Sequence, residues 1–256
     1  MMKVFVLNLD RDRERLEAVD KQLRRLGVEY ERIPAVYGKS LSTAEKNSKV
    51  NRFRWWCAVG RPITDGELGC ALSHATAYRK IVKEELPMAC VLEDDVVLDD
   101  RIPLVLNGLS QMLQSAVSQV ALLSNHSYPE GQVGDGHNGF RSPSGMVDLS
   151  LTAIESDMFA EGYVITSAAA KALLRANDPV ITCCDWWGRW RKLGHIELYH
   201  AFPTVCSQDK SRYESHTAEG MICAVRNRSL LGWTGYKLKR LMGKLMDRMF
   251  VVATGR

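Results

Sequence analysis

The sequence predicts an α/β fold, in which a mainly parallel sheet is covered by helices, and two stretches carry this prediction. Residues 2–9 form a buried apolar strand, residues 16–26 keep helical spacing up to Gly27, and residues 28–36 alternate as a second strand. Such a strand–helix–strand opening is the βαβ pattern of α/β sheets. Further along, an apolar run begins at Met88 and stops at three consecutive carboxylates. An uninterrupted apolar run is typical of a strand that is buried on both faces, as in a parallel sheet.

Length and composition limit the class of protein. The 256 residues suit one large domain, or one domain with an appendage, and 46% hydrophobic and 25% charged residues are ordinary for a globular protein. We expect no membrane span, which needs about 20 apolar residues, and no signal peptide. The seven cysteines are odd in number and include no CxxC pair. They predict reduced thiols in a cytoplasmic protein.

A capping box is predicted before the central helix. Thr64 and Glu67 have the required spacing, ahead of a helix at 68–85 that Pro87 ends. Glu67 therefore has a structural interpretation beside any functional one. Residues 39–61 show no clear pattern, and the later elements are predicted as a helix at 102–117, a strand at 120–123, a loop at 128–146, a strand at 162–166 and a helix at 168–175 capped by Ser167.

The three carboxylates Glu93, Asp94 and Asp95 at the end of the apolar run are hard to explain by packing. Their repulsion and desolvation would have to be offset, and a bound divalent cation does this directly. Residues i and i+2 of a strand share a face, so Glu93 and Asp95 are predicted to lie on one side. The alternative is a solvated strand end or the acidic first turn of a helix.

Further candidates for chemistry lie outside the acidic stretch. Asp185 is a single carboxylate among apolar and aromatic residues, a setting that produces a general base, although it could also be the N-cap of a helix at 186–193. Arg15 lies in the loop after the first strand and could face a diphosphate, or could belong to a solvated helix start. Ser73 and His74 are adjacent on the central helix and so point about 100° apart. A single helical histidine is more often structural than catalytic.

The order of these motifs resembles glycosyltransferase family 25, in its bacterial lipooligosaccharide galactosyltransferase group. The resemblance covers roughly residues 2–216, and its most specific part is GELGCALSH followed by LEDD. It implies a GT-A type α/β fold with a Rossmann-like nucleotide-binding sheet. It also implies a UDP-sugar donor (usually UDP-galactose), a bound Mn²⁺ or Mg²⁺, and inverting transfer to a sugar acceptor.

The resemblance assigns roles by position. It makes Asp95 the metal ligand, with Glu93 beside it and Asp94 near the donor, and it makes Asp185 the catalytic base. A C-terminal histidine could complete the metal site; the candidates are His200 and His216, of which His216 follows the matching block. Trp186 and Trp187 belong to a tryptophan cluster that departs from the family pattern; aromatic residues beside a base could stack on the acceptor sugar, with core filling as the alternative. The remaining donor-binding positions are Leu9, Asp10, Arg15, Ala35, Val36, Gly38, Glu67, Ser73 and His74.

The C-terminal segment has a different charge from the rest. Residues 221–256 hold eight basic residues and one acid, a net charge of +7, which leaves −3 for residues 1–220. Within this segment basic and apolar residues fall on opposite sides of a helix, which predicts an interfacial anchor for anionic lipid, with an ordinary packed helix as the alternative. We therefore expect a catalytic domain at 1–220 and a basic amphipathic tail at 221–256. The predicted location is cytoplasmic, on the inner face of the cell membrane, where a lipid-linked glycan acceptor would be reached.

Two other classes of protein compete with this interpretation. A sugar nucleotidyltransferase should carry a Gly-rich phosphate loop near the N-terminus, and LNLDRDRER contains no glycine. A nucleic-acid-binding protein could use the basic tail, but the acidic balance of residues 1–220 argues against nucleic acid as a partner.

Overall fold

The structure, a computed structural model, describes residues 2–124, 139–151 and 160–209. Its helices are α1 (Arg13–Arg25), η1 (Gly38–Ser40), α2 (Thr43–Lys49), α3 (Arg52–Val59), α4 (Asp65–Lys83), α5 (Ile102–Met112), α6 (Ser167–Asn177) and α7 (Trp187–Lys192). Its strands are β1 (Lys3–Asn8), β2 (Glu31–Pro34), β3 (Met88–Glu93), β4 (Val96–Leu98), β5 (Gln119–Leu122), β6 (Gly139–Arg141), β7 (Asp148–Leu151), β8 (Gly162–Thr166), β9 (Glu197–Phe202) and β10 (Cys206–Gln208).

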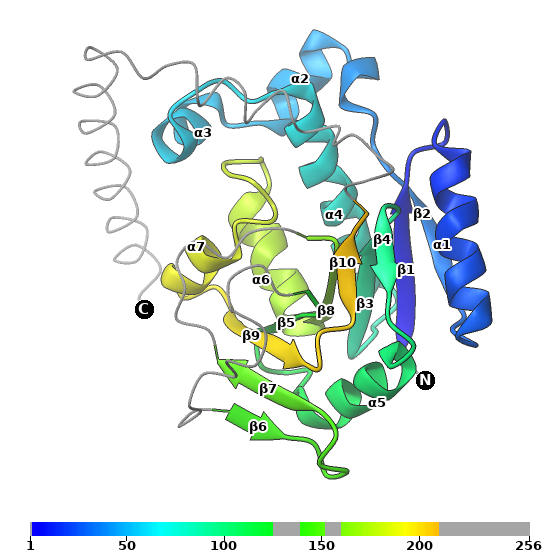
Figure 1. Cartoon of the computed structure of the whole chain (residues 1–256). Helices are drawn as coiled ribbons and strands as arrows, with labels where there is room; N and C mark the ends of the chain where they lie inside the picture. Colours follow the sequence, from blue (N-terminus) through cyan, green and yellow to red (C-terminus); the bar gives the residue numbers. More distant parts are fainter. Residues whose placement is uncertain (1, 125–138, 152–159, 210–256) are drawn as a thin grey trace, which may run out of the picture. The chain divides into compact units, whose positions relative to one another are not determined.

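Eight of these strands form one sheet in the order β2-β1-β3-β8-β5-β9-β7-β6 (Figure 1). β1 pairs in parallel with β2 and with β3, whereas β8 runs antiparallel between β3 and β5. The α/β, Rossmann-like prediction is confirmed, but the sheet is mixed where the apolar run had indicated a parallel one. An antiparallel strand buried on both faces has the same apolar composition, so the run alone does not report strand direction.

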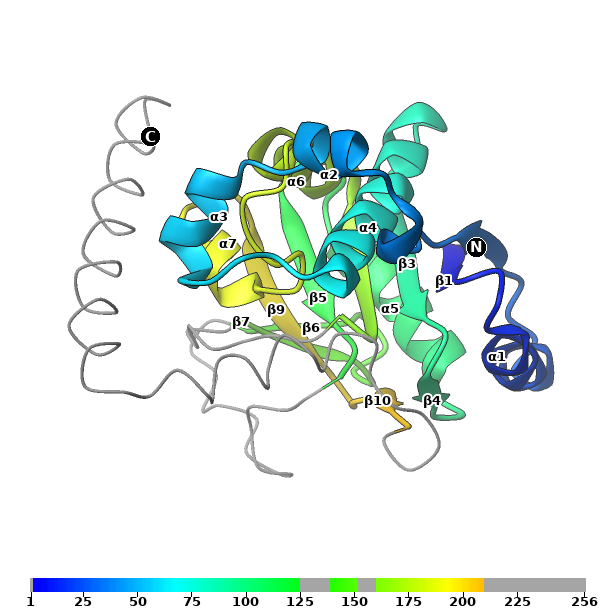
Figure 2. The ribbon, with the colours of Figure 1, turned by 90° about the horizontal axis from the view of Figure 1, so that it is seen from above.

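Alternate residues of β1 and β3 pack on opposite faces of the sheet. Val6 and Leu92 belong to a buried cluster that also contains apolar residues of α1 and α5. Phe5 points the other way, since the Lys80 Nζ of α4 lies 5.9 Å from the centroid of its ring. α1 and α4 accordingly lie on opposite sides of β1 (Figure 2). The face on which a residue of β1 or β3 lies thus decides which helix it meets.

The chain reverses its direction of strand addition at β1. β2 is added on one side of β1 through α1, and β3 is later added on the other side. Leu7 is opposite Glu93 in the β1–β3 register, so the carboxyl ends of the two strands are level. In open α/β sheets, ligands bind at the carboxyl ends of the strands where the strand order reverses. By this rule, the acidic stretch lies at the edge of the sheet where such folds bind their ligands.

The described residues fall into two compact units. The first contains residues 2–35, 73–176 and 185–209 within these described ranges and holds the sheet. The second contains Val36–Leu72 and Asn177–Cys184, with its own core around Trp55, Leu68 and Val180. The predicted division into a catalytic domain at 1–220 and a tail at 221–256 stays a prediction, because the tail lies outside the described residues.

Several local predictions differ from the structure. Residues 39–61 form η1, α2 and α3, and the loop predicted at 128–146 contains β6 at its described end. α6 is capped by Thr166, whose Oγ1 accepts from the Ala169 backbone N–H at 3.3 Å, and begins at Ser167, the residue predicted as its cap. None of the helices in the described ranges is both long and apolar enough to cross a membrane.

The six cysteines that the described residues include are free thiols. In the second unit, the Sγ atoms of Cys70 and Cys184 lie 3.5 Å apart.

Close backbone contact in the second unit explains one of the predicted site positions. A Cβ atom added to Gly38 would lie 1.8 Å from the Asp65 carbonyl oxygen and 3.1 Å from the Gly69 backbone nitrogen. We predict that Gly38→Ala lowers the free energy of unfolding by about 1–3 kcal/mol or more, the loss that overpacking of a dense region causes. Urea denaturation measures this loss. Exposed Ser40→Ala is the matched control and should stay within about 0.5 kcal/mol of the parent. Equal stability of the two variants would contradict the close contact.

Candidate active site

Polar side chains gather where β1 and β3 end. The Asn8 Nδ2 donates to the Asp94 Oδ2 at 2.7 Å, and the Arg15 Nη1 lies 3.3 Å from the Asp94 Oδ1. Arg32 in turn donates from Nε to the Asn8 Oδ1 at 3.0 Å. Asn8 and Arg15 are both buried, so Asp94 is held by two side chains that have few other positions open to them. Arg15 thus contacts the acidic stretch, and its predicted role in donor binding stays a prediction.

The carboxylates of the acidic stretch have different partners. β3 ends at Glu93, and Asp94 and Asp95 form the turn into β4. Glu93 faces α4, where its Oε1 lies 3.2 Å from the His74 Nε2. Asp95 instead lies 3.6 Å from the Arg15 Nη1, which also holds Asp94. Because β3 ends at Glu93, strand alternation does not place Asp95, and the two carboxylates have different hydrogen-bonding partners, although the charge of Asp95 is the largest that acts on Glu93.

The positive charge near the three carboxylates does not balance their negative charge. Burial and the negative charges of Asp95, Glu161, Asp185 and Asp94 raise the pKa of Glu93 well above its usual range. Burial also raises the pKa of Asp94, although the hydrogen bond from Asn8 and the charge of Arg15 act against it. Asp185, which is distant in sequence, is thus close enough to act electrostatically on Glu93.

A divalent cation fits this group of residues. The Asp95 Oδ2 accepts from the Gln208 Nε2 at 3.0 Å, but the Asp95 Oδ1 is buried and has no hydrogen-bond partner among the described residues. A buried, unpartnered carboxylate oxygen is costly unless a cation or water satisfies it. Oxygen ligands suit Mn²⁺ and Mg²⁺, and a cation there would offset the repulsion that raises the pKa of Glu93. Asp95 and Glu93 are the residues that would hold it.

His74 is buried and 1% exposed, and both of its ring nitrogens face protein groups. Its Nδ1 lies 2.7 Å from the Tyr163 hydroxyl and its Nε2 faces Glu93. His74 thus reaches the site through Glu93, and the structure gives it no open surface for the direct donor contact predicted from the sequence. Ser73 is likewise buried, at 4% exposure.

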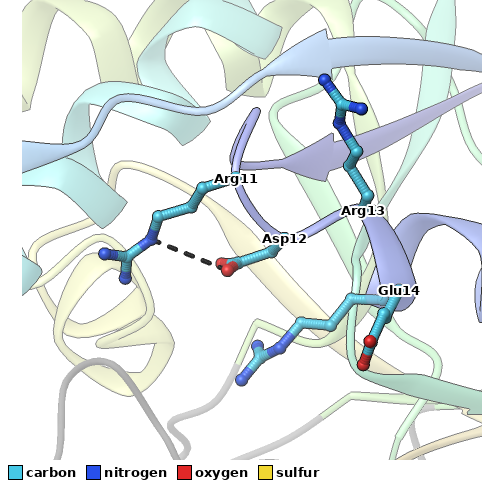
Figure 3. Close-up of a pocket in the computed structure, with 5 residues that line it drawn as sticks. Arg11, Asp12, Arg13 and Glu14 are labelled. Carbon is cyan, nitrogen blue, oxygen red and sulfur yellow. Dashed lines mark ion pairs between the residues drawn. The ribbon is translucent and has the colours of Figure 1, made fainter.

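The first predicted nucleotide block lies around the start of α1. Arg11–Arg15 line a pocket of about 380 Å³, in which Arg11 and Asp12 form a 3.6 Å ion pair and Arg13 extends in another direction (Figure 3). Asp10 is exposed and pairs with Arg32, and the Leu9 carbonyl accepts from the Asp12 backbone N–H. Arg15 connects this block to Asp94, and the role of the block in donor binding stays a prediction.

The second predicted block has mainly backbone roles. The Ala35 N–H donates to the Asn8 carbonyl at 2.9 Å, which ties the end of β2 to the end of β1. In the second unit, Val36 and Gly38 lie against the backbone of Gly69 in α4. Neither Gly38 nor Gly69 has room for a Cβ atom there. These positions were predicted from the sequence to bind the donor. In the structure, their backbones pack closely against neighbouring backbone atoms.

Glu67 belongs to the capping box that the sequence predicted. The Thr64 N–H donates to the Glu67 Oε2 at 2.9 Å, and the Glu67 N–H donates to the Thr64 Oγ1 at 3.2 Å. The Arg61 Nη1 also donates to Oε2, at 2.8 Å. Burial alone would raise the pKa of Glu67, but the bonds from Arg61 and Thr64 and the charge of Arg61 together lower it. The structural interpretation of Glu67 is the one that these contacts support.

Asp185 is not the N-cap of α7, because that position belongs to Trp186. Trp187 is fully buried and its ring lies 4.8 Å from that of Tyr163, so the core-filling alternative holds for Trp187 and its acceptor role is wrong for this structure. Trp186 is only partly buried, with the Arg189 guanidinium 5.8 Å from its ring centroid. Trp186 therefore remains the aromatic candidate for an acceptor contact.

His200 is buried in β9, with its Nδ1 3.4 Å from the Ser124 carbonyl oxygen, and His216 lies outside the described residues. Four residues of the site had not been predicted: Asn8, Glu161, Tyr163 and Gln208. For Asn8 the sequence did hold a clue, since a polar residue ends an otherwise apolar strand. The other three depend on strands that pair across long sequence separations.

Open α/β sheets bind their ligands, nucleotides among them, at such a switch point. The chain belongs to glycosyltransferase family 25, whose sequence profile, described as glycosyltransferase family 25 (LPS biosynthesis protein), matches residues 1–187. The resemblance seen in the sequence is thereby confirmed.

The relatives include procollagen galactosyltransferases. The chain is 27% identical over 180 residues to procollagen galactosyltransferase 2 of Homo sapiens and 30% identical over 180 residues to procollagen galactosyltransferase 1 of Danio rerio. Each match covers 68% of this chain and 28% of the relative. A glycosyltransferase 25 family member of Drosophila melanogaster is 36% identical over 97 residues, which are 37% of this chain and 16% of the relative. The chain thus spans less than a third of the length of these relatives.

We predict that Glu67→Gln destabilises the protein at neutral pH by about 1–2 kcal/mol, because it removes the charge from a hydrogen-bonded, mostly buried carboxylate. The pKa of Glu67 is lowered by folding, so its contribution is present above the pKa of the unfolded chain, about 4.3, and is lost as pH falls through the folded pKa. Urea denaturation at several pH values should show the difference from the parent shrinking below about pH 4.3.

Glu45→Gln is the matched control for Glu67→Gln. Glu45 occupies the same position in the capping box of α2 but is exposed, so its replacement should have the smaller effect. An unchanged difference between parent and Glu67→Gln across the whole pH range would show that the ionised carboxylate does not stabilise the fold.

Proposed function

We propose that this protein is a metal-dependent, inverting glycosyltransferase that moves a sugar from a UDP-sugar, UDP-galactose in particular, to a lipooligosaccharide or lipopolysaccharide acceptor. The observation that carries the proposal is the unpartnered, buried Asp95 Oδ1 in an acidic group at the carboxyl ends of β1 and β3. Membership of family 25 and the galactosyltransferase relatives support the class of reaction. The family's description as LPS biosynthesis protein supports the class of acceptor.

The donor half of the site rests on Asn8, Arg15 and the acidic stretch. Arg15 orients Asp94 and Asp95 from one side, since its Nη1 lies 3.3 Å and 3.6 Å from their carboxylates. Asp95 and Glu93 would hold Mn²⁺ or Mg²⁺. When bound, such a cation supplies positive charge that stabilises the departing nucleoside diphosphate.

The acceptor half rests on Asp185, which we propose as the general base. It would take the proton from the acceptor hydroxyl as that oxygen attacks the anomeric carbon of the sugar and the bond to the diphosphate breaks. One positioned base contributes roughly 10²–10⁴-fold to the rate. The charge of Asp185, which contributes to the raised pKa of Glu93, supports this role. Trp186 would contribute an aromatic contact to the acceptor.

The basic tail at 221–256 remains a proposal from the sequence pattern alone. We infer that it would bring the enzyme to anionic lipid at the inner face of the cell membrane, close to a lipid-linked acceptor.

The test of the donor half is hydrolysis of a panel of UDP-sugars with and without Mn²⁺. We predict that the parent protein hydrolyses at least one UDP-sugar in a Mn²⁺-dependent way and that Asp95→Asn reduces this hydrolysis, and the Mn²⁺-dependent heat of UDP binding, below detection. Asp99→Asn is the control, because Asp99 lies four residues away on the surface and pairs with Arg101. Unchanged titration heat for Asp95→Asn would refute its role as a metal ligand.

Asp185→Asn should separate donor binding from transfer. We predict that UDP binding with Mn²⁺ stays within about twofold of the parent, while transfer to a glycan acceptor falls by roughly 10²–10⁴-fold because the proton acceptor is lost. Steady-state transfer assays and calorimetry measure the two quantities. Transfer that survives within about tenfold would reduce Asp185 to a structural residue.

A further inference from the structure

A chain of buried hydrogen bonds ends on Glu93. The Glu93 Oε1 lies 3.2 Å from the His74 Nε2, the His74 Nδ1 lies 2.7 Å from the Tyr163 hydroxyl, and that hydroxyl donates to the Tyr78 hydroxyl at 3.0 Å. His74 and Tyr78 are one turn apart on α4, and Tyr163 is in β8, next to β3 in the sheet. Two elements thus converge on the last residue of β3.

The two partners of the imidazole fix the orientation of the His74 ring. The Tyr163 O–H donates to Tyr78, and the Tyr163 oxygen lies 2.7 Å from the His74 Nδ1, so both ring nitrogens of His74 have a fixed protein partner. A ring nitrogen held in this way sets the plane of the imidazole, and with it the position of Nε2 opposite Glu93. The same use of the second ring nitrogen orients histidines in metal sites.

Packing prevents the chain of bonds from rearranging. His74, Tyr163 and Tyr78 are 1%, 0% and 4% exposed, so water does not compete for their hydrogen bonds. The rings of His74 and Tyr163 stack with their centroids 5.7 Å apart, and the centroids of the Trp187 and Tyr163 rings lie 4.8 Å apart. The Glu93 side chain, in contrast, is 28% exposed. The network therefore runs from the interior to a carboxylate that an incoming ligand can reach.

We propose that His74 and Tyr163 are positioning residues, which hold the Glu93 carboxylate by its Oε1 and leave Oε2 to the cation and donor. This inference rests on the proposed function, because it concerns the same site, but it assigns His74 a role different from donor contact. Core filling alone would be served equally well by phenylalanine at position 163. The hydroxyl that links His74 to Tyr78 is the feature that a positioning role requires.

Tyr163→Phe tests the proposal, because it removes one hydroxyl and keeps the ring against His74 and Trp187. Tyr199→Phe is the matched control: Tyr199 is buried in the same unit at 4% exposure, and its hydroxyl donates to the Glu197 Oε2 at 2.9 Å, on β9. Both variants should lose similar stability in urea denaturation. Three further quantities are then compared between the variants. The first is the affinity for Mn²⁺ without donor, measured from the paramagnetic resonance signal of free Mn²⁺. The other two are kcat and KM for hydrolysis of the UDP-sugar.

Loss of a partner behind a metal ligand reduces metal affinity or activity by roughly 10–100-fold. We expect Tyr163→Phe to weaken Mn²⁺ binding by about tenfold or more and to raise the KM for the donor more than it lowers kcat. Tyr199→Phe should leave the Mn²⁺ affinity, the KM and the kcat unchanged. His74→Gln, whose amide reaches the place of Nε2, should retain more Mn²⁺ affinity than His74→Asn, whose shorter amide takes the place of Nδ1.

Equal Mn²⁺ affinity and equal KM in Tyr163→Phe and Tyr199→Phe would overturn the positioning role while leaving the proposed function intact. The same holds if His74→Asn binds Mn²⁺ as tightly as His74→Gln. A parent protein that neither binds Mn²⁺ nor hydrolyses any UDP-sugar would instead overturn the proposed function, and the inference with it.

Discussion

Parallel pairing between β1 and β3 is the constraint on which the site depends. The register sets Leu7 opposite Glu93, so the residue that ends β1 and the residues that follow β3 must meet at one edge of the sheet. Asn8 can then donate to Asp94, and α1, which starts five residues after β1 ends, can bring Arg15 to the same carboxylate. A shift of one residue in this register would turn Glu93 away from α4 and separate it from His74.

The same edge concentrates negative charge, and the neighbouring residues offset only part of it. Arg15 serves Asp94 and Asp95 together, whereas Glu93 meets His74 and the charges of Glu161 and Asp185. Four acids around one carboxylate raise its pKa, which is the electrostatic condition that favours a bound cation. In the second unit, the charge of Glu67 is balanced by Arg61.

Local patterns predicted much of the fold because they depend on neighbours in sequence. The capping box at Thr64 and Glu67, the strand at 162–166 and the helix stop at Gly27, where φ is +66°, all follow from interactions within a few residues. Local patterns carried less information beyond the end of an element. β3 ends at Glu93, so Asp95 lies in a turn and its contacts could not be derived from strand alternation. Trp187 is close to Asp185 in the sequence but packs against Tyr163, so its predicted acceptor contact was wrong.

By itself, the sequence determined that this is an α/β protein, that its acidic stretch ends a buried strand, and that its motifs are those of family 25. These conclusions depend on periodicity and on the order of residues along the chain. Only the tertiary structure decided that Glu93 and Asp95 face different partners, that Asn8 and Gln208 belong to the site, and that His74 acts through Glu93. The reason is physical: hydrogen bonds between residues about 20 to 110 positions apart depend on strand order and register, which no local pattern encodes.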